Sequence, residues 1–318
     1  MTVSLDHVID DRQAHIHYSW DRSNEPILTA QPGDVIRFEC RDATDGQLDH
    51  DSTADDLEVL DFQGHPLTGP VRIDGVAAGD TLVIDILELD HHGIGFTYFY
   101  PGNADKGLLP DEFDAPGLHV WDLDGRVGKF VKGIDVPLAP FPGNLGVPPA
   151  SPGSHSTVPP RTVGGNLDIK HLTAGSRLYL PVAVDGGLFS IGDCHAAQGD
   201  GEVCITGIEA PMDVTVRLDV RDDLEITSPR FRTTGPFSPH RDDELMVATA
   251  GIADDLMDAT KSAVRGMLDY LETERGLTRT EAYLLSSVAV DLKINEVVDA
   301  PNWVVSAYLA DRLFPDCS

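Results

Sequence analysis

Short segments in which apolar and polar residues alternate recur along the first 220 residues, and turn signals such as Pro32-Gly33 and Gly79-Asp80 precede them. This pattern is typical of β-strands, because successive side chains of a strand face opposite sides of a sheet. We therefore expect strands at residues 34–40, 70–74, 81–87, 177–182, 187–192 and 212–220.

The character of the chain changes after about residue 245. Apolar residues then recur at helical spacing between residues 253 and 275, and residues 280–289 predict a second helix. We expect a third helix from Pro301 to near Phe314. The fold class is therefore α+β and β-rich, with a core at residues 1–245 and a helical C-terminal part at residues 246–318 packed on that core.

Residues 137–165 are rich in proline and glycine. Proline removes a backbone donor and glycine weakens regular structure, so we expect neither a helix nor a central strand here. A linker is one interpretation. We favour an ordered loop over the functional site, because long loops in compact proteins often carry function and this one leads into a dense polar cluster.

Acidic residues outnumber basic ones by 53 to 23, which gives a formal charge of -30. Nucleic acids and anionic membranes require clustered cations, so neither is the expected partner. The split into 40 Asp, 13 Glu, 17 Arg and 6 Lys resembles the composition of salt-adapted proteins. Because molar salt screens self-repulsion, we expect the fold to loosen when salt is removed. An ordinary acidic enzyme is the alternative.

The sequence indicates a soluble, cytoplasmic protein. No apolar run approaches the roughly 18–20 residues of a membrane span, and the first residues lack the basic and apolar regions of a signal peptide. The cysteines form no Cys-x-x-Cys pair, which argues against a thiolate zinc site and, without an export signal, against disulfides. They are Cys40, Cys194, Cys204 and Cys317.

The segment 192–202, Gly-Asp-Cys-His-Ala-Ala-Gln-Gly-Asp-Gly-Glu, holds the densest group of chemically active residues. Residues two apart on a strand share a face, so Asp193 and His195 can converge on one ion, and Asp200 and Glu202 can do the same. A carboxylate with an imidazole suits zinc or a similar divalent ion. A polar hairpin turn is the simpler interpretation.

Two further polar clusters are weaker. Asn166, Asp168 and Lys170 would share one face of a strand, where they could bind an amide, a metal and a developing oxyanion. An ordinary strand edge is the alternative. Residues 41–53 are acidic enough to hold calcium, but Gly46 stands at the wrong offset for an EF-hand and chance enrichment is the stronger interpretation. There is no Gly-x-Ser-x-Gly and no phosphate-binding loop.

Several of these segments together resemble the acetamidase/formamidase family. They lie in the same order over residues 10–315, and the long His-Ala-Ala-Gln-Gly-Asp-Gly-Glu block is specific. The segments that carry the resemblance are 65–70, 159–161, 164–168, 189–204 and 281–286. The resemblance implies hydrolysis of a short aliphatic amide to a carboxylate and ammonia. It also implies a β-sandwich-like core and a homodimer or higher homo-oligomer.

The resemblance further implies dependence on a divalent metal, most often zinc and sometimes calcium. The candidate ligands are Asp168, Asp193 and His195, with Asp42 as a weaker fourth because its segment resembles a site segment of the family. Such an ion can polarise the carbonyl and lower the pKa of water to roughly 7.

The remaining roles follow from what amide hydrolysis needs. Glu202 is the candidate general base and then acid, because one carboxylate can pass a proton from water to nitrogen. Asp200 would orient Glu202 or join the metal, and Lys170 would help to hold the amide oxygen. Four residues of the matching segments are assigned to substrate binding: His65, Gly165, Asn166 and Gln198.

The sequence leaves open one other mechanism, one other class of substrate and one non-catalytic role. Cys194 could attack the amide with His195 or Glu202 as base, although neighbouring strand residues face opposite sides. The fold could cleave a different amide or a lactam. A metal- or amide-binding β module without catalysis is the third possibility.

Overall fold

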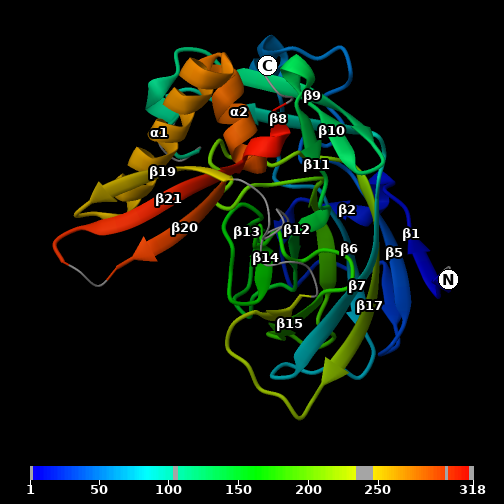
Figure 1. Cartoon of the computed structure of the whole chain (residues 1–318). Coiled ribbons are helices and arrows are strands. Elements are labelled where there is room, and N and C mark those ends of the chain that lie inside the picture. Colours follow the sequence, from blue (N-terminus) through cyan, green and yellow to red (C-terminus); the bar gives the residue numbers. More distant parts are fainter. Residues whose placement is uncertain (1–2, 103–106, 234–245, 298–299, 315–318) are drawn as a thin grey trace.

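Two six-stranded sheets dominate the computed structural model, which describes residues 3–102, 107–233, 246–297 and 300–314 (Figure 1). The first sheet has the order β1 (His7–Ile9), β5 (Val35–Cys40), β17 (Met212–Arg221), β7 (Thr81–His91), β15 (Arg177–Pro181) and β18 (Arg230–Arg232). The second has the order β14 (Gly164–Asn166), β12 (Phe141–Gly146), β16 (Phe189–His195), β6 (Leu67–Ile73) and β2 (Ile16–His17), and β4 (Leu28–Ala30) also pairs with β6.

The two sheets pack face to face around an apolar core. The rings of Phe38 on β5 and Phe189 on β16 meet edge to face, with their centroids 5.8 Å apart. Side chains from both sheets, including Ile36, Val216 and Ile191, are fully buried in one cluster. Each strand contributes alternate apolar residues to this layer, so the period-two pattern of the sequence becomes a sandwich. The predicted β-rich α+β fold is confirmed.

Smaller sheets and short helices accompany the two large sheets. A four-stranded antiparallel sheet contains β11 (Asp135–Pro137), β10 (Val127–Lys129), β9 (Gly117–Asp124) and β8 (Ile94–Phe99). A two-stranded ribbon pairs β13 (His155–Ser156) with β3 (Ser19–Trp20). The short 3-10 helices are η1 (Gln13–His15), η2 (Ala54–Val59), η3 (Pro110–Glu112), η4 (Val131–Gly133) and η5 (Asp311–Leu313).

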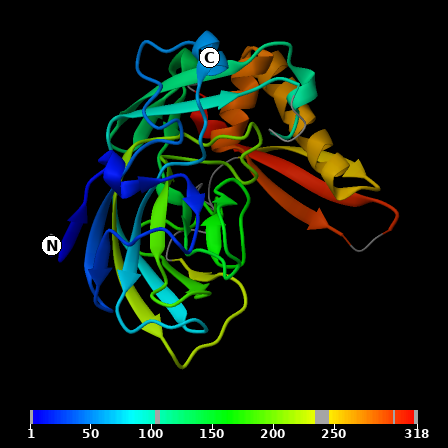
Figure 2. The same ribbon diagram turned by 180° about the vertical axis from the view of Figure 1, so that it is seen from behind.

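The C-terminal part combines two helices with a three-stranded sheet. Helix α1 (Leu256–Arg275) packs on β19 (Met246–Ala253) and β21 (Trp303–Ala310), and β20 (Asp291–Glu296) completes the sheet. This sheet extends away from the sandwich in both views (Figures 1 and 2). Helix α2 (Arg279–Ala289) lies against β8 and β9. Among the described residues, no helix has the length and apolar character that a membrane span requires.

Both predicted helices before residue 290 are confirmed, and their ends have clear physical causes. The Asp255 carboxylate accepts hydrogen bonds from two backbone amides in the first turn of α1, and Gly276 ends that helix with φ 64. Thr278 and Glu281 form a capping box at the start of α2. All six predicted strands are present as well.

The predicted helix that begins at Pro301 is wrong. Residues 303–310 form β21, the central strand of the C-terminal sheet, between β19 and β20. This segment contains Trp303, Val304, Val305 and Tyr308, and β-branched and aromatic side chains favour strands. Its buried side chains include Val305 and Ala307, which face the layer under α1.

The expectation that residues 137–165 hold no central strand is also wrong. Strand β12 lies between β14 and β16 in the interior of the second sheet, and all of its residues are buried. Gly143 explains why: a Cβ atom there would lie 2.6 Å from Asp168 Oδ1 and 2.8 Å from the Asp193 carbonyl oxygen. A glycine at this position lets three chain segments approach closely, which no other residue would allow.

Candidate active site

Strand β16 ends in the pair that the sequence singled out. Asp193 Oδ1 lies 3.7 Å from His195 Nε2, and both side chains are buried. The backbone at Asp193 has φ 52, so this end of the strand is not regular. A left-handed conformation at a non-glycine residue is costly and is concentrated at functional sites. The predicted convergence of these two side chains is confirmed.

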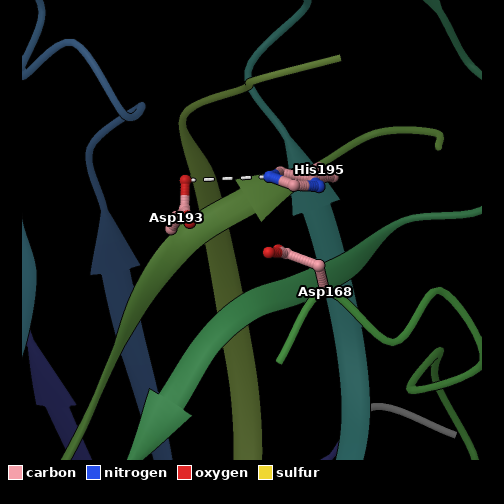
Figure 3. Close-up of side chains that lie close together, drawn as sticks. All are labelled: Asp168, Asp193 and His195. Carbon is pink, nitrogen blue, oxygen red and sulfur yellow. Dashed lines mark ion pairs between the residues drawn. The ribbon is translucent and has the colours of Figure 1, made fainter. Parts of the chain in front are cut away.

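Asp168 reaches the same point from the segment after β14. Figure 3 shows its carboxylate directed toward Asp193 and His195. One ligand atom from each of these three side chains can be chosen so that all lie within 4.8 Å of one another. Asp168 also has a positive φ, of 47. The neighbouring Asn166 ends β14 and lines the same cavity.

Two glutamates complete the acidic cluster. Glu209 Oε2 lies 3.1 Å from His195 Nε2, and Glu202 Oε1 lies 3.9 Å from His195 Nδ1. Isolated β-bridges connect residue 209 with His195 on β16 and with Phe96 on β8, which fixes Glu209 between these two strands. Glu202 follows a tight turn and has φ 45. The Glu202 side chain is 18% exposed and that of Glu209 only 2%, so Glu202 is the more accessible of the two.

Gln198 contacts both His195 and Asp168. Its Oε1 atom lies 2.7 Å from His195 Nδ1, and its Nε2 atom donates to the Asp168 carbonyl oxygen at 3.0 Å. An amide oxygen only accepts, so His195 carries its proton on Nδ1 and directs Nε2 toward the carboxylates. Histidines that bind metals are commonly oriented by such a bond on the other ring nitrogen.

His65 orients Asp193 from the opposite side. Asn144 Nδ2 donates to the Thr157 carbonyl oxygen at 3.0 Å and to His65 Nδ1 at 3.3 Å. The Nε2 atom of His65 then carries the proton, and it lies 3.8 Å from Asp193 Oδ2. Asp193 thus lies between two imidazoles.

One cavity of about 410 Å³ joins these residues. Its lining contains six of the residues that the sequence predicted: His65, Asn166, Asp168, Asp193, His195 and Glu202. Glu209 and Tyr98 also line it. The site therefore collects side chains from β8, β14, β16 and the loops around them into one cavity.

Charge is concentrated in this cavity. Burial raises the pKa values of Asp168, Glu202 and Glu209. Burial alone would also raise the pKa of Asp193, but His65 and His195 beside it hold that pKa well below its usual range. Grouped buried carboxylates resist ionising together unless a cation neutralises them.

The donor atoms fit a divalent cation. In the cavity lining, the Asn166 Oδ1 and Asp168 Oδ1 atoms are buried and have no hydrogen-bond partner among the described residues. Buried polar atoms without a hydrogen-bond partner are rare in proteins, and a bound ion is one explanation for them. Two carboxylates and an imidazole form a donor set typical of zinc. The cluster can therefore hold a metal ion.

Five predicted site residues lie outside the cavity lining: Gln198, which is described above, and the four that follow. Lys170 is buried and forms ion pairs with Asp291 and, at 3.4 Å, with Asp200. It therefore cannot share a face with Asn166 and Asp168, because β14 ends at Asn166 and the chain turns. The expectation that Asp200 and Glu202 share one face of a strand is wrong, because residues 200 and 201 form a turn.

Asp42 and Gly165 are the other two. The Asp42 carboxylate accepts hydrogen bonds from the Thr44 amide at 2.8 Å and from the Gly46 amide at 3.1 Å, so it closes a turn. Gly165 lies within β14, outside the cavity lining.

Cys194 does not face the cavity. Its fully buried side chain forms a hydrogen bond with the Cys40 side chain. This bond, together with burial, raises the pKa of the Cys194 thiol well above its usual value. A thiol with a raised pKa forms little of the reactive thiolate. The expectation that Cys194 and His195 face opposite sides of the strand is confirmed.

Sequence reasoning missed Glu209 and Gly143. The signal for Glu209 was present, because it stands between the apolar Ile208 and Ala210, and a lone acid in a buried segment needs a partner. Gly143 gave no signal, since its neighbours come from distant parts of the chain.

The fold and the cavity define a β-sandwich protein with a buried site of carboxylates and histidines. The family model described as "Acetamidase/Formamidase family" matches residues 2–156 and 150–316. The chain therefore belongs to the acetamidase/formamidase family.

Individual relatives agree with this assignment. The chain is 28% identical to a formamidase from Methylophilus methylotrophus, covering 96% of this chain and 90% of that protein. A γ-lactamase from Delftia acidovorans has the same fold, with a TM-score of 0.89 and 27% identity over 98% of this chain and 94% of that one. An acetamidase from Bacillus halodurans gives a TM-score of 0.67 and 30% identity over 95% and 97% of the two chains. This protein is a hydrolase of amide C–N bonds.

Proposed function

We propose that this protein hydrolyses a small primary amide, such as formamide or acetamide, to a carboxylate and ammonia with the help of a bound divalent cation. The observation that carries the proposal is the single cavity that collects Asp168, Asp193, His195, Glu202 and Glu209. The formamidase and acetamidase names of two relatives support the choice of substrate.

Asp168, Asp193 and His195 would hold the cation, and Glu209 is close enough to join them. A bound zinc ion supplies a Lewis acid that polarises the carbonyl and lowers the pKa of water. Zinc suits this set better than calcium, because calcium prefers oxygen ligands and His195 offers a nitrogen.

Glu202 is the proposed proton carrier. It lines the cavity, it is the more exposed of the two glutamates, and burial raises its pKa above the usual value, the direction that suits proton transfer. Glu202 would take a proton from the attacking water. It would then give that proton to the nitrogen as the C–N bond breaks, so that ammonia and not an amide anion leaves.

The other polar residues would position these groups. Asn166 offers a side-chain amide to the substrate from the end of β14. His65 orients the Asp193 carboxylate, and Gln198 fixes the ring of His195. In this proposal Gln198 supports the site and does not touch the substrate, because it contacts the cluster from the side away from the cavity.

Hydrolysis of a lactam, which is a cyclic amide, is a second candidate function. The γ-lactamase gives a TM-score of 0.89, against 0.67 for the acetamidase from Bacillus halodurans, and this difference favours it. The same residues would cleave the ring C–N bond. The amine would then stay attached to the product, so no ammonia would be released.

Metal analysis beside an ammonia assay tests the proposal. We expect the Asp193→Ala and His195→Ala variants to lose both bound metal and ammonia release from acetamide. Asp135→Asn is the matched control, because Asp135 is 51% exposed and pairs only with Lys129 among the described residues. Full metal content and full activity in both cavity variants would overturn the proposal. Ring opening of 2-pyrrolidinone without ammonia release from acetamide would favour the lactam.

A further inference from the structure

The cavity is larger than the smallest amides need. Its volume is about 410 Å³. Acetamide has four non-hydrogen atoms and occupies on the order of 100 Å³, if each atom takes about the 30 Å³ of a water molecule in the liquid. Cavities of roughly 300–1,000 Å³ typically enclose drug-sized ligands. Formamide or acetamide would therefore leave much of this space unfilled.

The lining of the cavity divides by chemistry. Asp193, His195 and Glu209 are buried, and the His65 and Glu202 side chains are only 14% and 18% exposed, whereas two apolar side chains are about half exposed. Phe62 is 51% exposed and Val158 is 48% exposed. Three partly buried residues also line the cavity: Leu60, Tyr100 and Ile205. The polar groups thus occupy the inner end, and these five residues form an apolar mouth.

The apolar mouth rests on fixed structure. Leu60 and Tyr100 pack against a small buried cluster that includes Leu57 and Tyr98. The ring of Phe62 meets the ring of His65 edge to face at 5.3 Å. The amide of Ile205 donates to the Glu202 carbonyl oxygen at 2.9 Å, which closes the turn that carries both residues. A mouth held in this way is preformed for an apolar ligand.

We infer that the preferred substrates are primary amides with a branched aliphatic or aromatic acyl group, which fills the apolar mouth while the amide reaches the inner end. This inference rests on the proposed function and extends it to a substrate class. The step is the same for every member. The oxygen of water bonds to the carbonyl carbon, the C–N bond breaks, and the nitrogen leaves as ammonia with that electron pair and a proton.

The expected preference has a size. Burying one methylene group is worth roughly 0.8 kcal/mol, which corresponds to about a fourfold gain in kcat/KM. We therefore expect kcat/KM to rise by about this factor with each added carbon from formamide to acetamide to isobutyramide, and to be high for benzamide. A pocket built only for formamide would instead reject the larger amides.

Substitutions at the mouth test which residues cause the preference. Phe62→Ala and Val158→Ala each remove one apolar side chain, and we expect each to lower the ratio of kcat/KM for isobutyramide to that for formamide several-fold. Val158 is included because Phe62 also contacts His65. Val59→Ala is the control, because Val59 is close to Phe62 in sequence, is 79% exposed and lies outside the cavity lining. It should leave the ratio unchanged.

Binding gives a measurement that does not depend on turnover. In the Glu202→Gln variant, the dissociation constants of acetamide, isobutyramide and benzamide should fall with acyl size when measured by calorimetry. Hydrolysis of formamide with a decline through the series, and no gain in binding, would overturn this inference and leave the proposed function intact. Failure to cleave any primary amide would overturn both.

Discussion

His195 Nδ1 lies 2.7 Å from the Oε1 atom of Gln198, a residue that also donates a hydrogen bond to the Asp168 carbonyl oxygen. One buried amide therefore fixes the ring of one candidate metal ligand and the backbone of another. Gln198 lies outside the cavity, so its effect is on geometry and not on contact with the substrate.

Substitution of Gln198 tests this relationship. We expect Gln198→Leu to weaken zinc binding by about 10–100-fold, because the His195 ring loses the acceptor that orients it. Gln198→Glu keeps that acceptor and should retain most of the affinity. Competition with a chelator measures the affinity, and thermal melting of each variant checks the fold. Equal zinc affinity in the Leu variant and the unmodified protein would contradict the orienting role.

Gly143 is the second test, because it lies where β12 passes beneath the site. A Cβ atom there would lie 2.6 Å from Asp168 Oδ1 and 3.3 Å from the Cε1 atom of His195. We expect Gly143→Ala to displace both side chains and to reduce amide hydrolysis by about a hundredfold or more. Gly266→Ala in α1 is the control, since its Cβ would lie no closer than 3.2 Å to Thr249. Normal activity in the Gly143 variant would show that the cluster tolerates movement.

Cys194 separates the two mechanisms that the sequence left open. Its side chain packs against Cys40 of β5 in the core between the two six-stranded sheets, so we expect Cys194→Ser to keep most of its amidase activity. The variant should be less stable, by about 1–3 kcal/mol, because a hydroxyl enters an apolar environment. Steady-state kinetics at a temperature where the variant is folded decides the question. Complete loss of activity in the folded variant would point to a thiol nucleophile.

His17 predicts how stability depends on pH. Its Nδ1 atom lies 2.8 Å from the Ser19 carbonyl oxygen and its Nε2 atom 2.8 Å from Ser190 Oγ. Burial lowers the pKa of His17 from its usual 6.5 to about 4. Between these two values the unfolded chain binds more protons than the folded one, so this contribution is complete above pH 6.5 and is lost as pH falls toward 4.

The His17 contribution amounts to at most about 3 kcal/mol. Urea unfolding at pH 7, 5.5 and 4.5 measures the free energy of unfolding of the unmodified protein and of His17→Gln. The variant lacks the ionisable ring and should lose less stability on acidification. Parallel pH dependence in the two proteins would show that His17 does not titrate between the folded and unfolded states.

Much of the fold could be predicted from local patterns, and the errors have one cause. The strand at 212–220 and the helix at 253–275 follow from periodicity, because each buries one face. Residues 141–146 and 303–310 are central strands, although the local sequence predicted no central strand in the first segment and a helix in the second. Residues 141–146 tolerate proline and glycine because segments from distant parts of the chain lie close to Gly143. Residues 303–310 form a strand because they pair with β19 and β20. Local propensity cannot report such contacts.

The candidate site was predictable where one segment or a specific motif carried it. Asp193, His195 and Glu202 come from one block, and they converge as expected. The positions of Glu209 and of Lys170, which is buried away from the cavity, depend on how separate loops meet, and spacing along the chain does not encode this. Salt adaptation, self-association and a cytoplasmic location stay predictions.

Removal of the metal tests the central proposal most directly. The protein is treated with a chelator, dialysed free of divalent ions and assayed for ammonia release from acetamide and isobutyramide. We expect the rate to fall by about a hundredfold or more, and to return when stoichiometric zinc is added. A full rate of ammonia release from protein shown to contain no divalent metal would contradict the proposal that the cluster around His195 acts through a bound cation.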